Sequence, residues 1–269
     1  MPTPIPAPGF YGTDITNSFN NPGIVSAQHH SIFVNEPPAH WGDPLTFLSD
    51  LDQSRFIHVV DQYAGATADN RYTLGTSYLA SLTLPANHTF QRSDIIALLH
   101  AAAALSGDGF GHIYHVFLPQ GADVCMRPGF CYSPDDPANF AFCALHNAVT
   151  FTDAVGEVIF TLEPYQNIIG CSSPPRGTPN GSTADSTYTS LSHEVFETIS
   201  DPEVIGWLNR ASGEEMADLC DRYFVKPDGI AYTDAINSRL NGYRYRIQAE
   251  YSNQVHACVY PAAGGEGDK

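Results

Sequence analysis

The cysteines are the feature that most constrains how this chain can fold. Among 269 residues there are six cysteines, and all of them follow residue 124. Their spacing lacks the paired Cys-x-x-Cys of a zinc ribbon. An even number of cysteines is typical of disulfides in an oxidising compartment, although six cysteines allow about 15 pairings. We therefore expect a secreted, extracellular protein with disulfides at Cys125, Cys131, Cys143, Cys171, Cys220 and Cys258.

The N-terminal residues and the hydropathy of the chain bear on export. Residues 1–9 contain four prolines, no basic residue and no apolar stretch, so we do not expect a signal peptide within this chain. No apolar run approaches the roughly 20 residues that a membrane-spanning helix needs. We expect no membrane association from these patterns.

The charge balance narrows the class of partner. The chain has 29 Asp plus Glu against 12 Lys plus Arg, a net charge of −17. Nucleic acid and anionic membrane surfaces are bound through clustered basic side chains, so neither is an expected partner. An acidic surface favours solubility. We expect a monomer. Its expected partner is a peptide or protein substrate, or alternatively a wall polysaccharide.

Strand patterns alternate with helix patterns along the chain. We expect strands within residues 24–34, 77–84, 113–118 and 156–162, and helices within residues 44–53, 93–105 and 187–200. This alternation predicts an α/β (or α+β) fold with a mixed sheet. No linker divides the chain, so a single domain is expected at residues 23–262. Residues 1–22 are expected to form an irregular arm, and residues 263–269 a flexible tail.

Three of the six cysteines lie within residues 119–150, together with Pro128, Pro134 and Pro137. This segment is expected to be a disulfide-pinned loop region. The two adjacent histidines His29 and His30 are expected at the surface.

The helix expected at 187–200 carries the strongest candidate for chemistry. His193 and Glu197 are four residues apart, which places both side chains on one face of a helix. The pattern has the geometry of a zincin active-site helix, His-Glu-x-x-His, with Glu197 in place of the second histidine. Glu194 then occupies the position of the general base, next to a water whose pKa the metal lowers.

A plain structural explanation of the same pattern is the solvated face of an acidic helix. The apolar residues Leu191, Val195, Phe196 and Ile199 surround the polar trio and instead indicate a largely buried helix. Buried histidine and carboxylate side chains need partners, which favours a metal. A proline at 202 is expected to end the helix.

A metal site needs at least a third ligand. Asp218 is our first candidate and Glu215 the second, and Cys220 could fasten their segment by a disulfide. His146 lies in the cysteine-rich loop, which we expect to close over the site. His146 or Tyr223 would then stabilise an oxyanion. The other histidine candidates for a ligand are His112, His115, His146 and His256, and His146 is favoured because it lies in the cysteine-rich loop.

Several of these motifs, in this order, resemble one family. The matching elements are Phe142-Cys143-Ala144-x-His146, Ser192-His193-Glu194-x-x-Glu197, Asp201-Pro202, Trp207 and Ala217-Asp218-x-Cys220. The chain is similar, from about residue 22 to residue 260, to the EXORDIUM/phosphate-induced-protein family and its microbial relatives. The resemblance implies an extracellular protein, because the plant members are cell-wall growth-response proteins without an assigned activity. The plant members lack the His-Glu pair, whereas the microbial members have a helix similar to that of zincins.

Two functions follow as hypotheses. The first is a secreted zinc-dependent metallohydrolase, most simply a zincin-like peptidase that uses a metal-activated water. The second is a non-catalytic extracellular protein that binds cell-wall polysaccharide or takes part in signalling, with a structural metal site. Calcium is the alternative ion, but its sites need six or more oxygens, and a ligand set centred on His193 favours zinc.

Overall fold

The computed structural model describes residues 3–5, 14–136, 138–168, 170–173, 178–220, 224–225, 231–232, 236–240 and 242–260. Within these ranges the fold is mixed α/β, as expected, with four α-helices. The helices are α1 (Pro44–Asp52), α2 (Asp61–Ala64), α3 (Arg92–Ser106) and α4 (Ser182–Ser200).

A five-stranded sheet forms the centre of the fold. Its strand order is β4-β3-β6-β10-β9, and the strands are β3 (Ala27–Val34), β4 (Tyr72–Ala80), β6 (His112–Phe117), β9 (Leu145–Thr150) and β10 (Glu157–Glu163). The strands β4, β3, β6 and β10 run parallel to one another, and β9 runs antiparallel to β10. The sheet is therefore mixed, as predicted, and β9 is an edge strand.

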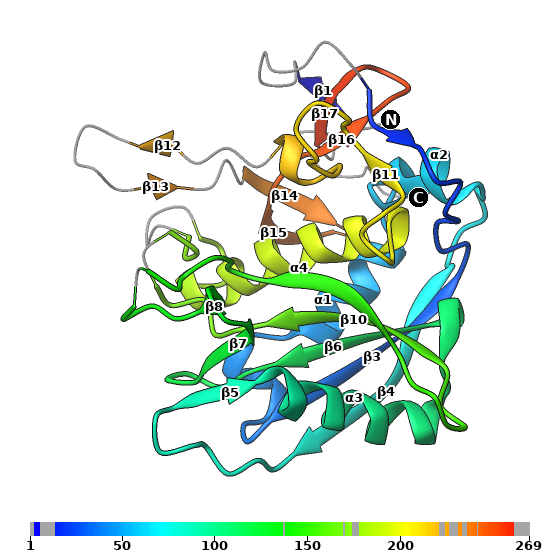
Figure 1. The fold of residues 1–269 in the computed structure, drawn as a ribbon. Helices are drawn as coiled ribbons and strands as arrows, with labels where there is room; N and C mark the ends of the chain where they lie inside the picture. The colour runs from blue at the N-terminus through cyan, green and yellow to red at the C-terminus, as the bar shows by residue number, and fades with distance from the viewer. Residues whose placement is uncertain are drawn as a thin grey trace.

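Helices cover both faces of this sheet, so its strands contribute to two cores (Figure 1). On β10, Val158 and Phe160 pack in the core beneath α3, whereas Ile159 between them packs in the core that includes α1 and α4. This alternation follows from the period of two of a β-strand. Thr161 and Glu163 share the face of Ile159, so they point with it toward α4.

Shorter strands build the rest of the molecule. They are β1 (Thr3–Ile5), β2 (Thr16–Asn17), β5 (Thr89–Gln91), β7 (Asp123–Arg127), β8 (Phe130–Tyr132), β11 (Trp207–Leu208), β12 (Phe224–Val225), β13 (Ala231–Tyr232), β14 (Ile236–Leu240), β15 (Tyr243–Ile247), β16 (Glu250–Ser252) and β17 (Ala257–Tyr260). The hairpin β14–β15 packs against α4, on the side of the helix away from the central sheet (Figure 1). Helix α4 is thus enclosed between two sheets, which explains why most of its length is buried.

The N-terminal arm differs from its expected description. Within residues 1–22, which the prolines led us to expect to be irregular, β1 pairs with β17 and β2 pairs with β11. Partner strands more than 180 residues away impose this extended pairing, and the local sequence does not reveal it. The tail expected at residues 263–269 lies outside the described residues.

The helix boundaries follow local signals. Asp43 accepts a hydrogen bond from the backbone of Thr46 at 3.1 Å and begins α1. Helix α3 begins at Arg92, one residue before the expected start at residue 93, and Asp94 accepts a hydrogen bond from the Gln91 backbone at 2.8 Å. Helix α4 ends at Ser200, directly before Asp201-Pro202 as predicted, and begins five residues before residue 187.

All six cysteines are paired. The disulfides are Cys125–Cys131, Cys143–Cys171 and Cys220–Cys258. The segment 119–150, which we expected to be a pinned loop region, does contain the Cys125–Cys131 bridge and one end of the Cys143–Cys171 bridge, but it also contains β7, β8 and β9. Its loop prediction was therefore wrong in part, because prolines between short strands concealed the strand pattern. Among the described residues, no helix has the length and apolarity needed to span a membrane.

Candidate metal centre

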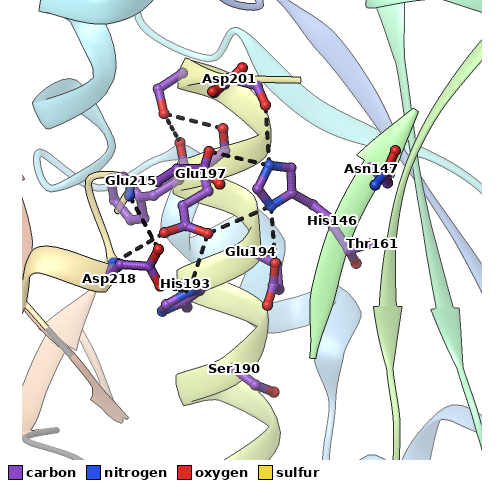
Figure 2. Close-up of polar contacts among 12 residues, drawn as sticks. His146, Asn147, Thr161, Ser190, His193, Glu194, Glu197, Asp201, Glu215 and Asp218 are labelled. Carbon is purple, nitrogen blue, oxygen red and sulfur yellow. Dashed lines mark hydrogen bonds and ion pairs between the residues drawn. The ribbon is translucent and has the colours of Figure 1, made fainter. Parts of the chain in front are cut away.

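Two histidines and four carboxylates converge beside α4 (Figure 2). They are called the His–carboxylate cluster here, and its members are His146, His193, Glu194, Glu197, Glu215 and Asp218. Helix α4 supplies three members from one face, β9 supplies His146, and the loop before and within the short 3-10 turn Asp218–Cys220 supplies the last two. Sequence segments 72 residues apart thus meet at one place.

One half of the cluster is the trio predicted from sequence. His193 Nε2 lies 3.2 Å from Glu197 Oε2 and 3.6 Å from Asp218 Oδ1. We call His193, Glu197 and Asp218 the outer trio, since 42% of the Asp218 side chain is exposed. Two donors bound to one ion at about 2.1 Å lie about 3.0–3.4 Å apart at octahedral or tetrahedral angles. The outer trio therefore has the donor types and spacing that could hold a metal ion.

The other half of the cluster was not predicted as a ligand set. His146 Nδ1 lies 3.2 Å from Glu194 Oε2 and 3.6 Å from Glu197 Oε2. We call His146, Glu194 and Glu197 the inner trio, because each of these side chains is at least 95% buried. Glu197 Oε2 belongs to both trios and lies between the two imidazole rings.

The second nitrogen of each imidazole ring has its own partner outside the trios. His193 Nδ1 lies 3.1 Å from Gln248 Oε1, and Gln248 Nε2 donates to the Ala217 carbonyl at 2.9 Å. His146 Nε2 lies 3.1 Å from the Asp201 carbonyl oxygen and 3.4 Å from Glu215 Oε1. Metal-binding histidines regularly donate their other N–H to a carbonyl or carboxylate, which fixes the ring orientation. Both histidines have this arrangement.

The loop that carries Asp218 is fastened from two sides. The Cys220–Cys258 disulfide joins it to β17, as the sequence suggested for Cys220. The Asp218 backbone N–H donates to Glu197 Oε1 at 3.1 Å. Asp218 Oδ2 accepts from the Glu215 backbone at 3.1 Å, so Asp218 Oδ1 is directed at His193. Glu215 and Asp218 are three residues apart, but they contact different histidines.

The charges in the cluster shift its proton affinities strongly. Burial would lower the pKa of His193, but the neighbouring charge of Glu197, with Glu194 and Asp218, outweighs it and holds that pKa well above its usual range. The pKa of His146 is also held well above its usual range, because the charge of Glu215, with Glu194 and Glu197, outweighs the effect of burial. Burial and the charge of Asp218 raise the pKa of Glu197 to about 8. Bringing these carboxylates together costs free energy, which a bound cation would recover.

A cavity of about 220 Å³ opens beside the outer trio. His193, Glu194 and Asp218 line its polar side. Residues 141–144 and Cys171 line the other side, so the Cys143–Cys171 disulfide is part of the wall. The cysteine-rich segment therefore does border the site, as expected, and a small molecule could reach the outer trio.

The remaining histidines lie elsewhere. His29 and His30, expected at the surface, are 2% and 1% exposed, because helices cover both faces of the sheet that contains β3. His29 Nδ1 lies 2.7 Å from His115 Nε2, and His30 Nε2 lies 3.0 Å from His112 Nδ1. His256 pairs with Asp14 near the chain surface. These residues do not join the His–carboxylate cluster.

Some residues around the cluster could not be identified from the sequence patterns used above. Gln248 orients His193 from 55 positions along the chain, and no spacing rule connects the two. Glu163 is fully buried beside the cluster and accepts from Ser190 Oγ at 3.1 Å. The alternation of polar and apolar residues along β10 could have predicted that Glu163 lies on the sheet face that α4 covers. Tyr223, predicted to stabilise an oxyanion, lies outside the described residues.

Comparisons of this chain with protein-family models, with curated proteins and with solved structures found no match.

Proposed function

We propose that this protein is a secreted metal-dependent hydrolase, most simply a zincin-like peptidase with zinc in the outer trio. The observation that carries the proposal is the convergence of His193, Glu197 and Asp218 beside a cavity that His193 and Asp218 line. Three protein ligands leave a fourth position open, which is typical of catalytic zinc sites, whereas structural sites use four. One nitrogen and two oxygens suit zinc better than calcium.

The chain's own residues provide the other parts of such a reaction. A zinc ion in the outer trio would act as a Lewis acid that polarises a substrate carbonyl and acidifies water. Glu194 lines the cavity next to His193 and is placed to take a proton from that water. His146 holds Glu194 Oε2 at 3.2 Å, so it orients the base. Because His146 is buried behind Glu194, we assign it this positioning role in place of direct oxyanion contact.

A peptide substrate is supported by the edge strand next to α4. β9 lies at the end of the central sheet, and it carries His146 toward the cluster. An extended peptide could add to such an edge by main-chain hydrogen bonds and pass the cavity. The three disulfides support an oxidising, extracellular location.

The alternative function, binding of wall polysaccharide, has less support among the described residues. Exposed tyrosine rings on a strand can stack on sugars, and β15 contains Tyr243 and Tyr245. Tyr245 is buried and packs against Phe47 and Tyr188, so of these two tyrosines only Tyr243 is exposed. A single exposed ring makes a poor platform for a polysaccharide chain.

The test combines metal analysis with a cleavage assay on a mixed peptide library. Wild-type protein should contain zinc and cleave peptides, and removal of the metal by a chelator should abolish cleavage until zinc returns. His193→Ala should lose the outer-trio zinc. Glu194→Gln should keep that zinc and lose activity by about 100-fold or more. His100→Gln, which changes a partly exposed histidine paired with Asp153, is the matched control and should behave as wild type.

Two results would contradict the proposal. Full zinc content in His193→Ala would remove the outer trio as the site. A zinc-loaded wild-type protein that cleaves no peptide in the library, while zinc removal lowers only its stability, would favour the non-catalytic alternative.

A further inference from the structure

We propose that the inner trio binds a second divalent ion, and that Glu197 Oε2 bridges it to the ion of the outer trio. The inference rests on the proposed function only in taking the outer trio as a metal site. Its own basis is the inner trio of His146, Glu194 and Glu197, whose facing atoms lie within 4.8 Å of one another.

The first argument is that the two trios have the same dimensions. In each trio a histidine nitrogen lies 3.2 Å from one carboxylate oxygen and 3.6 Å from another. In each, the far nitrogen of the ring is directed to a carbonyl or amide oxygen outside the trio. Whatever qualifies the outer trio as a metal site therefore applies to the inner one.

The second argument concerns Glu197. Its Oε1 is held by the Asp218 backbone N–H at 3.1 Å, which leaves Oε2 to face both imidazoles. An oxygen bound about 2.1 Å from each of two ions allows a separation of at most about 4.2 Å, and two-metal hydrolytic sites have ions about 3.5–4 Å apart. One carboxylate oxygen is thus in the place of a bridging ligand.

The third argument is the charge balance. The cluster contains four carboxylates and two histidines. With neutral histidines, one divalent ion bound to four ionised carboxylates leaves a net charge of −2. Two divalent ions with neutral histidines give zero, and a mostly buried site favours neutrality.

A second ion would change the roles of two residues. Glu194 would bind the ion through Oε2, in the place that His146 Nδ1–H now fills. Glu215 would hold His146 from the opposite ring nitrogen, where it already lies 3.4 Å away. Two ions can clamp both the attacking and the leaving oxygen of a displacement, so the inference extends the hydrolase proposal to a dinuclear centre.

The test is the metal stoichiometry of metal-depleted protein titrated with Zn²⁺ and followed by calorimetry and elemental analysis. Wild type and the His100→Gln control should bind two equivalents. His146→Gln should bind one, in the outer trio. One equivalent in wild type, unchanged in His146→Gln, would overturn the second site and leave the proposed function intact. No binding at all would overturn both.

A spectroscopic measurement on wild type avoids dependence on a buried substitution that could impair folding. With two equivalents of Mn²⁺, electron paramagnetic resonance should show an exchange-coupled pair, because the ions share Glu197 Oε2. The coupled signal should be lost in His193→Gln. A signal of isolated Mn²⁺ alone in wild type would overturn the bridge.

Discussion

The molecule buries histidines in two regions, and their surroundings give them opposite proton affinities. In the central sheet, burial lowers the pKa of His29 to about 3 and that of His30 to about 4. In the His–carboxylate cluster, burial acts in the same direction, but carboxylates reverse its effect and raise the pKa of His146 and His193. Burial acts in both regions, so the difference between their pKa values comes from the carboxylates beside His146 and His193.

The two regions also differ in what their hydrogen bonds accomplish. The sheet histidines pair with each other, His29 with His115 and His30 with His112, so neutral rings satisfy the available partners. His146 contacts three carboxylates and His193 contacts two, so negative charge is in excess around both rings. We therefore expect the sheet histidines to serve stability, and the cluster histidines to bind cations.

The largest expected effect is stabilisation by zinc. An ion at about 1,000 times its dissociation constant stabilises the folded state by about 4 kcal/mol. For a chain of this size that raises the thermal midpoint by roughly 8–16 °C. The rise should be smaller in His193→Gln, which removes the outer-trio ion, and unchanged in the sheet variant His29→Gln. Thermal unfolding with and without zinc measures it, and an equal rise in all three proteins would contradict the comparison.

A smaller effect is expected from removing one buried negative charge in metal-free protein. Burial and the Asp218 charge raise the pKa of Glu197 to about 8, so the folded state holds a proton that the unfolded state releases near pH 4.5. Stability from this group is present below that pH and is lost as pH rises toward 8. Glu197→Gln should therefore stabilise metal-free protein at pH 9, by on the order of 2–3 kcal/mol.

Glu163→Gln is the matched variant for that experiment. Burial and the charge of Glu194 also raise the pKa of Glu163 to about 8, but Glu163 belongs to neither trio. Both variants should be stabilised at pH 9 in chemical denaturation, whereas only Glu197→Gln should lose zinc. If Glu163→Gln lost zinc to the same extent, the cluster would extend further than the two trios.

The smallest expected effect is a difference in the pH range over which the histidines of the two regions contribute to stability. Since the pKa of His29 is lowered from 6.5 to about 3, its contribution to stability is present above pH 6.5 and is lost as pH falls through that window. The pKa of His193 is raised, so in metal-free protein its contribution is present below pH 6.5 and is lost as pH rises.

Denaturation at a series of pH values tests this difference. His29→Gln should reduce the slope of stability below pH 6.5 by up to about 1.4 kcal/mol per pH unit. His193→Gln should change the slope above pH 6.5 instead. A change in the same window for both variants would show that the two regions titrate alike.

Much of the site followed from short-range patterns. The four-residue spacing of His193 and Glu197 and the proline after Asp201 act within one or two helical turns, so local backbone geometry is enough to place them. Asp218 was a candidate ligand on a segment that Cys220 could fasten, and the disulfide to Cys258 does hold that segment in place. Such short-range patterns depend on local backbone geometry and not on how distant segments pack.

Predictions that depended on packing were less successful. The adjacent residues His29 and His30 were expected at the surface, but both are buried because helices cover the sheet on each face. Glu215 and Asp218 are three residues apart, and a helical turn would direct them alike. Because the loop turns at Asp218, they reach different histidines.

The sequence by itself determined that this chain would pair its cysteines and place a histidine and two glutamates on one face of a buried helix, because both depend on residue type and local spacing. Only the tertiary structure decided that β9 would lie beside α4 and direct His146 at Glu197. That contact joins residues 51 positions apart through strand order and helix packing, which no local pattern encodes. It converts one candidate ligand set into two that share an oxygen.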